Sequence, residues 1–434
     1  MSNYNYYPRT LIISRNALRQ DGSNGKVMEQ FFADWKQECI AQFYTYNEEP
    51  NSSICQRFYR VTDKDALRSF LSMKKKFGGV IDNCVQENTP TAIIQEARVK
   101  KTPLSLLLRD LMWNTNRWRS RIFWRWIEDF KPEVIFMMAG ATSFTHKIAI
   151  DVSCKYNIPL IVFNTENYYF KKYDYLIDVG WKWLYPLLRW EGNVVFRHLM
   201  RQSAHEIYNN EYLNNIYSKE FGKQGSVIYQ ATSLKQFPDK EKNGKLVFSY
   251  AGNLGLDRHK ALIELSNALQ EISPDYKLNV YGKVRSKSVE KELLSSKGII
   301  YHGLVPYSQV IEVIKESDYM IHAESFDPFW VKDLCSAFST KISDILASGR
   351  CLILFAHKSL ACTEYVIKNE CGCVITQPSE LVNKIKELIK SDDLKKKYIA
   401  NGLVSAKRDM DSSLNSRRFR EIMINTIKNN KECH

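Results

Sequence analysis

Short apolar runs alternate with helical patterns along this chain, and the alternation constrains its fold more than any other feature. In the first half, apolar runs at 10–14 and 134–139 precede helical patterns at 27–42 and 144–156. The other runs predicted as strands are 43–46, 159–163, 226–229, 246–251, 277–281, 299–302, 319–323 and 351–355. Strands that alternate with helices are typical of α/β proteins with parallel sheets. We therefore predict doubly wound, Rossmann-like sheets.

The alternation stops once, in a polar stretch. At 434 residues the chain exceeds one ordinary core, so its length favours two domains. We predict an N-terminal Rossmann-like domain over 1–229, a linker over 230–244 and a C-terminal Rossmann-like domain over 245–411. A basic helix over 412–434 is expected to pack back on the first domain. Two such domains would face a central cleft at the carboxyl ends of their strands, where ligands bind in such folds.

Composition limits the class of protein and its partners. The formal net charge of +14 favours anionic partners. The N-terminus has no apolar signal region, and no apolar run reaches the length of a membrane-spanning helix. The ten cysteines are scattered, as expected of free thiols in a reducing compartment. We predict a cytoplasmic protein that can sit peripherally on the inner face of the membrane.

Two short motifs resemble parts of metal sites, but the residues around them argue against a bound metal in both cases. The spacing of Cys371-Gly-Cys373 is wrong for zinc, and the chain has no second such pair. Asp63-Lys64-Asp65 opens a helical pattern, where acidic side chains favour the helix start. We therefore predict no metal.

A hydroxyl-rich turn before the run at 351–355 indicates a phosphate site. Ser339 and Thr340 can cap a short helix that Gly349 ends, and Lys341 lies beside its first N–H groups. Unpaired amides at a helix start, next to a cation, bind anions.

The strands before this turn end in residues suited to the same ligand. Glycines there let the backbone approach a phosphate, cations neutralise it, and a carboxylate can bond ribose or sugar hydroxyls. The alternative is an ordinary set of turns with solvated charges. The candidates are Gly252, Asn253, Gly255, Arg258, Lys260, Gly282, Gly303, Leu304 and Glu324.

The first half carries candidates of a second kind. Polar residues follow the runs at 134–139 and 159–163, and two glycines lie in the loop after the run at 10–14. A second substrate would bind at these strand ends, opposite the phosphate site. The candidates are Gly22, Gly25, Thr142, Ser143, Thr165 and Glu166, of which Glu166 is our candidate base.

The pattern over 104–130 predicts one helix with apolar residues on both sides. One stripe, which includes Leu108, Leu111 and Ile122, is expected to face the core. The other side and its flanking arginines carry Trp113, Arg117, Phe123 and Trp124. That side either meets protein or contacts an anionic membrane surface, where Trp and Arg are favoured. No nucleic-acid-binding motif is visible.

The segments 246–374 and, more weakly, 130–170 resemble GT-B glycosyltransferases of group 1, family 4-like. The resemblance implies that a nucleotide-sugar donor binds the C-terminal domain and that the acceptor enters from the N-terminal one. Ser339, Thr340 and Lys341 would hold the diphosphate. Asp344 occupies the place of the second acid in the family's Glu-x7-Glu motif, and the first acid would fall near Ser336.

The chain departs from the family pattern at two further places. Asn253 replaces an arginine, and Thr165-Glu166 stands where many members have His-Asp. On this resemblance we predict a metal-independent hexosyltransferase with Glu166 and Asp344 as catalytic residues. It would use a nucleotide-sugar co-substrate, no cofactor, and a saccharide or lipid-linked saccharide acceptor, in surface polysaccharide synthesis.

Two alternatives stay open. The protein could be a nucleotide-sugar epimerase or hydrolase of the same fold. It could also be a catalytically silent basic protein that binds a membrane or nucleic acid, although nucleic acid is not expected.

Overall fold

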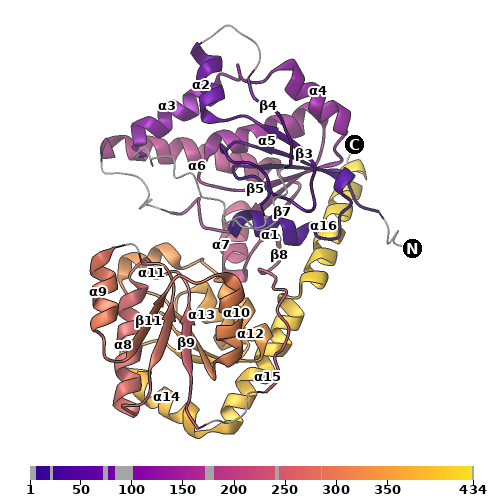
Figure 1. The fold of residues 1–434 in the computed structure, drawn as a ribbon. Helices are drawn as coiled ribbons and strands as arrows, with labels where there is room; N and C mark the ends of the chain where they lie inside the picture. The colour runs from indigo at the N-terminus through magenta and orange to yellow at the C-terminus, as the bar shows by residue number, and fades with distance from the viewer. Residues whose placement is uncertain are drawn as a thin grey trace. The chain divides into compact units, whose positions relative to one another are not determined.

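Two α/β units make up the chain (Figure 1). The computed structural model describes residues 6–19, 23–71, 77–83, 101–171, 180–239, 244–284 and 286–432. Unit 1 comprises Met1–Ile228 and Asn415–His434, and unit 2 comprises Tyr229–Leu414. The two sheets confirm the predicted α/β class.

In the described residues, unit 1 holds an eight-stranded sheet of order β4-β3-β2-β1-β5-β6-β7-β8. All neighbouring strands are parallel except β3 and β4. The order reverses between β1 and β5, as in a doubly wound sheet. The strands are β1 (Thr10–Ser14), β2 (Ile40–Tyr44), β3 (Arg57–Arg60), β4 (Gly79–Ile81), β5 (Val134–Met138), β6 (Leu160–Asn164), β7 (His205–Tyr208) and β8 (Ser226–Val227).

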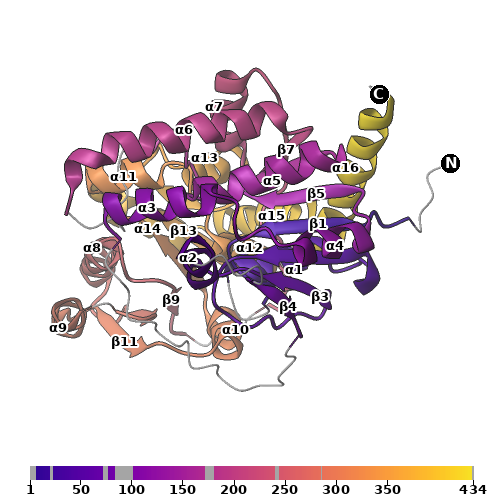
Figure 2. The ribbon, with the colours of Figure 1, turned by 90° about the horizontal axis from the view of Figure 1, so that it is seen from above.

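Helices cover both faces of this sheet. Figure 2 shows α3, α5 and α6 together on one face, where Leu11 and Ile13 of β1 join the core. Ile12 faces the opposite core, with α1 and α16. Because both faces are covered, β1 is apolar and buried along most of its length. The helices are α1 (Ser23–Phe31), η1 (Gln37–Cys39), α2 (Asp63–Leu71), α3 (Pro103–Asn114), α4 (Arg121–Phe130), α5 (Ser143–Tyr156), η2 (Lys182–Leu184), α6 (Tyr185–Gln202), α7 (Glu211–Phe221) and α16 (Ser412–Glu432).

The C-terminal part of α16 belongs to the core of unit 1. Phe419 stacks on Phe31 with ring centroids 4.9 Å apart and meets Phe32 edge-on at 5.0 Å. Met423 is fully buried in the same cluster. This aromatic cluster holds the end of the chain against the first sheet.

Within the described residues, unit 2 holds a six-stranded parallel sheet of order β11-β10-β9-β12-β13-β14. Its strands are β9 (Phe248–Ala251), β10 (Leu278–Tyr281), β11 (Ile299–Gly303), β12 (Tyr319–Ala323), β13 (Cys351–Phe355) and β14 (Cys373–Ile375). Its helices are α8 (Arg258–Ile272), α9 (Lys287–Ser295), α10 (Tyr307–Glu316), α11 (Pro328–Leu334), α12 (Thr340–Ser348), α13 (Ala361–Lys368), η3 (Pro378–Glu380), α14 (Leu381–Lys390) and α15 (Asp392–Asp409). The order reverses between β9 and β12, so ligands are expected at the ends of these two strands.

The described part of segment 230–244 packs on unit 2. The Ser343 hydroxyl donates to the Gln230 carbonyl over 2.9 Å, and the Phe237 amide donates to the Ser348 carbonyl over 3.0 Å. Arg350 donates to the Pro238 carbonyl over 3.1 Å. These bonds hold residues 230–238 against α12 and the residue after its C-cap, and we call these residues the strap.

The prediction of one helix over 104–130 is wrong. The chain forms α3 and α4 with a break in which Asn116 takes a left-handed φ of 57°. The break turns the second helix relative to the first, so the stripe over 104–130 is not continuous. Leu108 and Leu111, predicted to be core, are 56% and 60% exposed.

The side for which protein and a membrane surface were both left open packs largely on protein. Trp113 and Phe123 are each 1% exposed. The Trp113 indole donates to Asp63 over 2.7 Å, and Arg117 donates to the Phe70 carbonyl over 3.0 Å. Trp124 is half-buried under the ammonium of Lys155. Trp113 and Phe123 are therefore buried against protein, whereas the Arg117 side chain is exposed.

The second predicted strand was placed too late in the chain. The helical pattern over 27–42 ends early, and Ile40–Tyr44 pairs with β1 as β2. β3 and β4 were not predicted, because their short runs are anchored by pairing with β2 and with each other. No described helix is long and apolar enough to cross a membrane.

Candidate functional site

Lys341 lies in the first turn of α12, against the end of β9. A Cβ placed on Gly252 would stand 2.6 Å from both Cε and Nζ of Lys341. Burial, and then the charge of Arg258, lower the pKa of Lys341 to about 8. The ammonium is therefore held where little water solvates it. An anion that reached it would relieve that cost.

The prediction that Ser339 caps α12 is wrong. Ser339 is the N-cap residue but accepts no side-chain hydrogen bond there. Side-chain capping therefore does not occupy the first amides of this nine-residue helix. The Ile342 amide donates to the Ser339 carbonyl over 3.1 Å, and the Thr340 and Lys341 amides remain without a side-chain cap from Ser339.

Three predicted glycines lie together at the ends of β9, β10 and β11. The Gly252 amide donates to the Tyr281 carbonyl over 2.8 Å, and the Gly282 amide donates to the Gly303 carbonyl over 2.8 Å. A Cβ on Gly282 would lie 1.9 Å from the Gly252 carbonyl oxygen. Only glycine fits so close an approach of two loops.

Arg258 and Glu324 form a buried ion pair beside Lys341. The guanidinium donates to both carboxylate oxygens, over 2.7 and 3.0 Å. Nε2 of His322 lies 3.2 Å from Oε1 of the same carboxylate. Burial alone would raise the pKa of Glu324, but His322 and Arg258 lower it to about 2. Arg258 was predicted to neutralise a phosphate and Glu324 to bond hydroxyls, yet here each engages the other.

Asp344 joins the strap to α10. Its carboxylate accepts from the Thr232 hydroxyl over 2.5 Å and from the Tyr307 hydroxyl over 3.1 Å. Ser336, where the resemblance expects another acid, is buried and carries no charge.

The remaining predicted residues of unit 2 are either exposed or hold a loop in shape. Lys260 is 65% exposed on its side chain and pairs with Asp257 over 3.0 Å. Leu304 is 71% exposed. The Asn253 carbonyl accepts from the Tyr250 hydroxyl, and its side-chain oxygen accepts from the Gly255 amide over 2.9 Å. Asn253 and Gly255 therefore shape the loop after β9.

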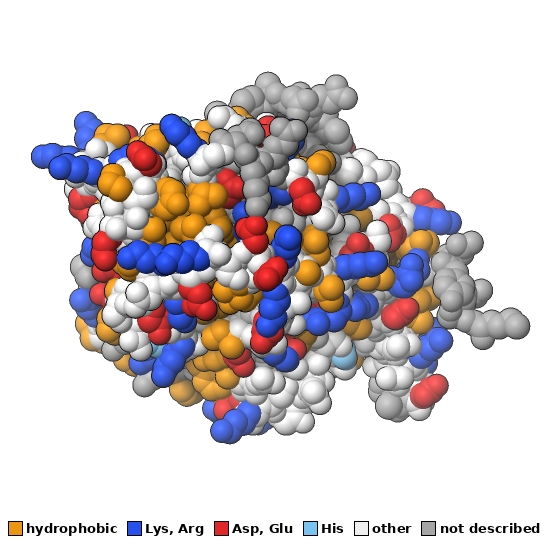
Figure 3. Space-filling view, turned by 90° about the horizontal axis from the view of Figure 1, so that it is seen from below, with side chains coloured by type: hydrophobic (Ala, Val, Ile, Leu, Met, Phe, Trp, Pro, Cys, Tyr) orange, Lys and Arg blue, Asp and Glu red, His pale blue; other side chains and the backbone are white. Residues whose placement is uncertain are grey.

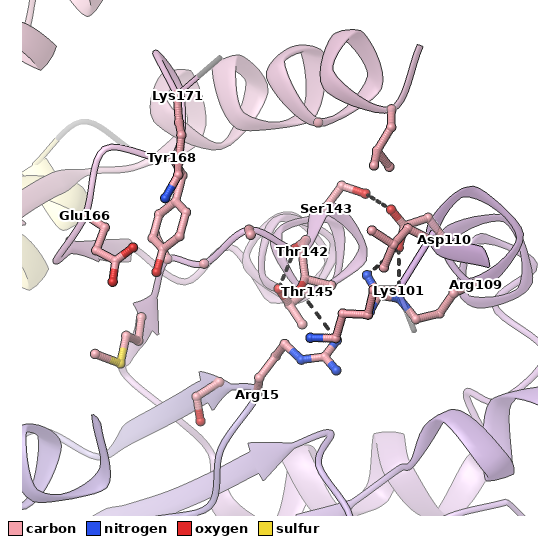
Figure 4. A pocket seen from close by; sticks show the side chains of 18 of the residues that line it. Arg15, Lys101, Arg109, Asp110, Thr142, Ser143, Thr145, Glu166, Tyr168 and Lys171 are labelled. Atoms are coloured by element: carbon pink, nitrogen blue, oxygen red, sulfur yellow. Dashed lines mark hydrogen bonds and ion pairs between the residues drawn. The ribbon is translucent and has the colours of Figure 1, made fainter. Parts of the chain in front are cut away.

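Unit 1 contains a cavity of about 380 Å³ at the carboxyl ends of β1, β5 and β6, between α3 and α6 (Figure 4). Thr142, Ser143 and Glu166, three of the predicted residues, line it. Five basic side chains and three acidic ones are also among its described lining: Arg15, Lys101, Arg109, Lys171 and Arg189, against Asp110, Glu166 and Glu191. The cavity is therefore polar and carries an excess of positive charge.

Two predicted residues of this half, Thr165 and Gly25, are not among the described lining of the cavity. Thr165 offers its carbonyl to Asn209 over 3.0 Å. Gly25 permits a close packing of loops, since a Cβ there would lie 2.6 Å from the Arg19 carbonyl oxygen. Gly22 lies outside the described residues.

His146, near the start of α5, has a structural role. Its Nε2 accepts from the Gly140 amide over 3.4 Å, and burial lowers its pKa to about 4. A neutral imidazole of this kind holds the loop after β5 in place.

Several cavity residues were missed from the sequence. Arg15 directly follows β1, so the strand-end rule used elsewhere would have found it. Arg109 and Asp110 lie inside α3, where nothing in the local sequence marks them. The packing of α3 beside α5 brings them to the cavity.

Part of the chain matches a known protein family. Residues 232–404 match the family described as glycosyl transferases group 1. A search of the curated proteins finds no match.

Solved structures share the fold of the whole chain. The sucrose-phosphate synthase of Thermosynechococcus elongatus is 11% identical, with a TM-score of 0.60 over 95% of this chain and 98% of that one. HepE of Anabaena, solved in complex with UDP, is 12% identical, with a TM-score of 0.61 over 96% and 100%. A glycosyltransferase of Rickettsia africae is 12% identical, with a TM-score of 0.58 over 98% and 100%. At these identities the likeness establishes the fold, which is GT-B.

Proposed function

We propose that this chain, a GT-B protein whose residues 232–404 belong to the group 1 glycosyl transferases, moves a sugar from a nucleotide-diphosphate sugar to an acceptor hydroxyl. The observation that carries the proposal is Lys341, held in the first turn of α12 against Gly252. Together with the uncapped amides of that helix, it makes a site for a diphosphate at the sheet's switch point.

The chemistry asks the protein to stabilise a departing diphosphate. Cleavage of the bond to the sugar leaves new negative charge on the phosphate oxygens. Fixed amides and a poorly solvated ammonium stabilise that charge as it forms, because they are already oriented. We propose that these groups supply this stabilisation without a metal, and that the sugar moved is a hexose.

UDP is the first nucleotide to test, because HepE of Anabaena binds it. Calorimetry with the full chain should show UDP binding that Lys341→Ala weakens by roughly tenfold or more, the size expected for a lost charged hydrogen bond. The matched control is Lys291→Ala, an exposed lysine on α9. Equal affinity in both variants would reject the role of Lys341.

Glu166 is the proposed base for the acceptor hydroxyl, because it lines the cavity of unit 1. Glu166→Gln should lower turnover strongly while UDP affinity changes little. Asp344→Asn should instead disturb the packing of the strap and α10, because Asp344 accepts hydrogen bonds from Thr232 in the strap and Tyr307 in α10. Product analysis with and without an added saccharide separates transfer from hydrolysis or epimerisation of the nucleotide sugar.

A membrane-bound acceptor, as in surface polysaccharide synthesis, would suit a stripe on α6. Trp183 of η2 and Trp190 of α6 are 71% and 65% exposed, and Leu187 and Val194 continue the same side of α6. Exposed Arg197 and Arg201 follow on that side. Aromatic and apolar residues with flanking arginines suit an anionic membrane surface.

Trp183→Ser with Trp190→Ser should therefore reduce binding to anionic liposomes, while Leu294→Ser, an exposed apolar residue on α9, should not. Nucleic acid is less suited as a partner. On the face shown in Figure 3, basic side chains are interspersed with acidic and hydrophobic ones. If the variant with Trp183→Ser and Trp190→Ser binds anionic liposomes as well as the Leu294→Ser control does, α6 does not contact the membrane.

A further inference from the structure

We propose that the cavity of unit 1 binds an acceptor through an oxyanion group, a phosphate or a carboxylate, held by Arg15, Arg109 and the start of α5. This inference rests on the proposed function and names the chemical class of the acceptor. Four features of the cavity support it.

The first feature is a pair of guanidinium groups on one aromatic ring. Arg15 and Arg109 lie 5.5 and 5.3 Å from the centre of the Phe144 ring. Phe144 itself stacks on the buried Trp113, with ring centres 4.2 Å apart and planes within 6°. The two cations come from different elements, yet a rigid aromatic stack holds both at one place. Two like charges so close are stabilised by an anion between them.

The second feature concerns the partners of Arg15, whose guanidinium also lies 4.4 Å from the centre of the Tyr46 ring. Among the described residues, the one carboxylate in ion-pair range is Asp63, at 3.8 Å, and Asp63 already accepts from the Trp113 indole. Nη1 of Arg15 reaches the Thr142 hydroxyl only over 3.5 Å. Its Nε is buried with no hydrogen-bond partner in the described structure. A buried donor without a partner is costly, and a ligand oxygen would satisfy it.

The third feature is the start of α5, which lines the cavity at Thr142 and Ser143. This helix has 14 residues, and its N-cap Thr142 makes no side-chain capping bond. First-turn amides and the helix dipole therefore add to the attraction for an anion.

The fourth feature is that Asp110 and Glu191, two acids of the cavity lining, pair with other side chains. Asp110 accepts from the Ser143 hydroxyl over 3.0 Å and pairs with Arg109 at 3.3 Å. Glu191 pairs with Lys147 at 2.7 Å. Burial raises the pKa of Asp110. Asp110 and Glu191 therefore do not balance the positive charge of Arg15 in the cavity.

The third acid lies elsewhere in the cavity. Figure 4 shows Glu166, Tyr168 and Lys171 on one side, and Arg15, Arg109 and Asp110 on the other. An acceptor anchored by its oxyanion at the arginines would present a hydroxyl toward Glu166. The anchor would therefore orient the acceptor as well as bind it.

The test compares glucose 6-phosphate, glucuronate and glucose by calorimetry on the full chain. All three are measured in the Lys341→Ala background too, so that binding at the diphosphate site of unit 2 is recognised. We expect one of the two anions to bind at least about tenfold more tightly than glucose, in both backgrounds. Preference for glucose 6-phosphate identifies a phosphate, and preference for glucuronate identifies a carboxylate. Equal affinity for all three, or no binding of either anion, overturns the proposal.

Variants assign the site. Arg15→Gln and Arg109→Gln should each weaken binding of the preferred anion about tenfold or more. Arg125→Gln, an exposed arginine on α4, is the control and should leave it unchanged. Equal loss in the control would show nonspecific attraction and reject the site. Arg109→Lys, which keeps the charge, should recover part of the affinity even if Arg109→Gln unfolds the cavity.

The two proposals fail separately. Loss of UDP binding with intact anion binding would reject the donor site alone. Intact UDP binding without a preference for anions would reject the acceptor class alone.

Discussion

The ammonium of Lys341 occupies the space that a side chain at position 252 would need: a Cβ on Gly252 would stand 2.6 Å from Nζ. A residue of the phosphate-binding turn and a glycine about ninety positions earlier are thus coupled. The coupling yields predictions that separate ligand binding from folding.

Gly252→Ala should weaken UDP binding by roughly tenfold while the unfolding temperature changes little. The added methyl group meets the flexible end of Lys341 at 2.6 Å and the hydroxyl of the buried Tyr250 at 2.9 Å. Lys341 can move away, but it then leaves the diphosphate site. Calorimetry and a thermal melt measure the two effects. Gly79→Ala, which meets nothing within 4 Å, controls for the substitution itself. Unchanged affinity would disprove the coupling.

Gly282→Ala should show the opposite pattern. Its Cβ would lie 1.9 Å from the Gly252 carbonyl oxygen, and backbone cannot move aside as a lysine can. We expect a loss of about 1–3 kcal/mol in the free energy of unfolding of unit 2, the usual cost of overpacking. Denaturant unfolding followed by hydrogen exchange in β9 and β10 measures it. A variant as stable as the parent would contradict this packing.

UDP affinity should fall as the pH rises from 7 to 9. Burial lowers the pKa of Lys341 to about 8, so the diphosphate meets a cation below this pH and a neutral amine above it. At pH 9 about a tenth of the amine is protonated, which predicts a roughly tenfold weaker complex than at low pH. Lys341→Arg should bind with little pH dependence, because arginine stays charged. An identical pH profile in both proteins would exclude Lys341 as the titrating group.

Glu324→Gln should destabilise unit 2 by about 3–5 kcal/mol, the cost of breaking a buried ion pair by removing one partner. Arg258 would be left as an unpaired buried charge, and Lys341 would lose a carboxylate that raises its pKa. UDP affinity near pH 8 should therefore fall as well. Glu312→Gln removes the exposed pair with Lys315 and should change stability by less than about 1 kcal/mol. Similar melting temperatures for the two variants would refute the burial argument.

Local sequence was sufficient for the architecture. The strands near 134–139, 319–323 and 351–355 were predicted within a residue or so. A strand that is covered on both faces is a nearly continuous apolar run, and such a run can be recognised without knowing which strands pair with it. The turn with Lys341 was found for the same reason, since strand, hydroxyl residues, lysine and helix are contiguous.

Long-range packing decided the rest. No local pattern shows that Asn116 breaks a helix, that Trp113 faces inward, or that Arg258 is bound by Glu324. Arg15 and Arg109 come from distant parts of the chain and both lie against the Phe144 ring, which stacks on Trp113. By itself the sequence determined the alternation of the long strands and helices and the place of the phosphate turn, because both depend on neighbours along the chain. Only the tertiary structure decided which charges remain available for a ligand, because that depends on neighbours in space.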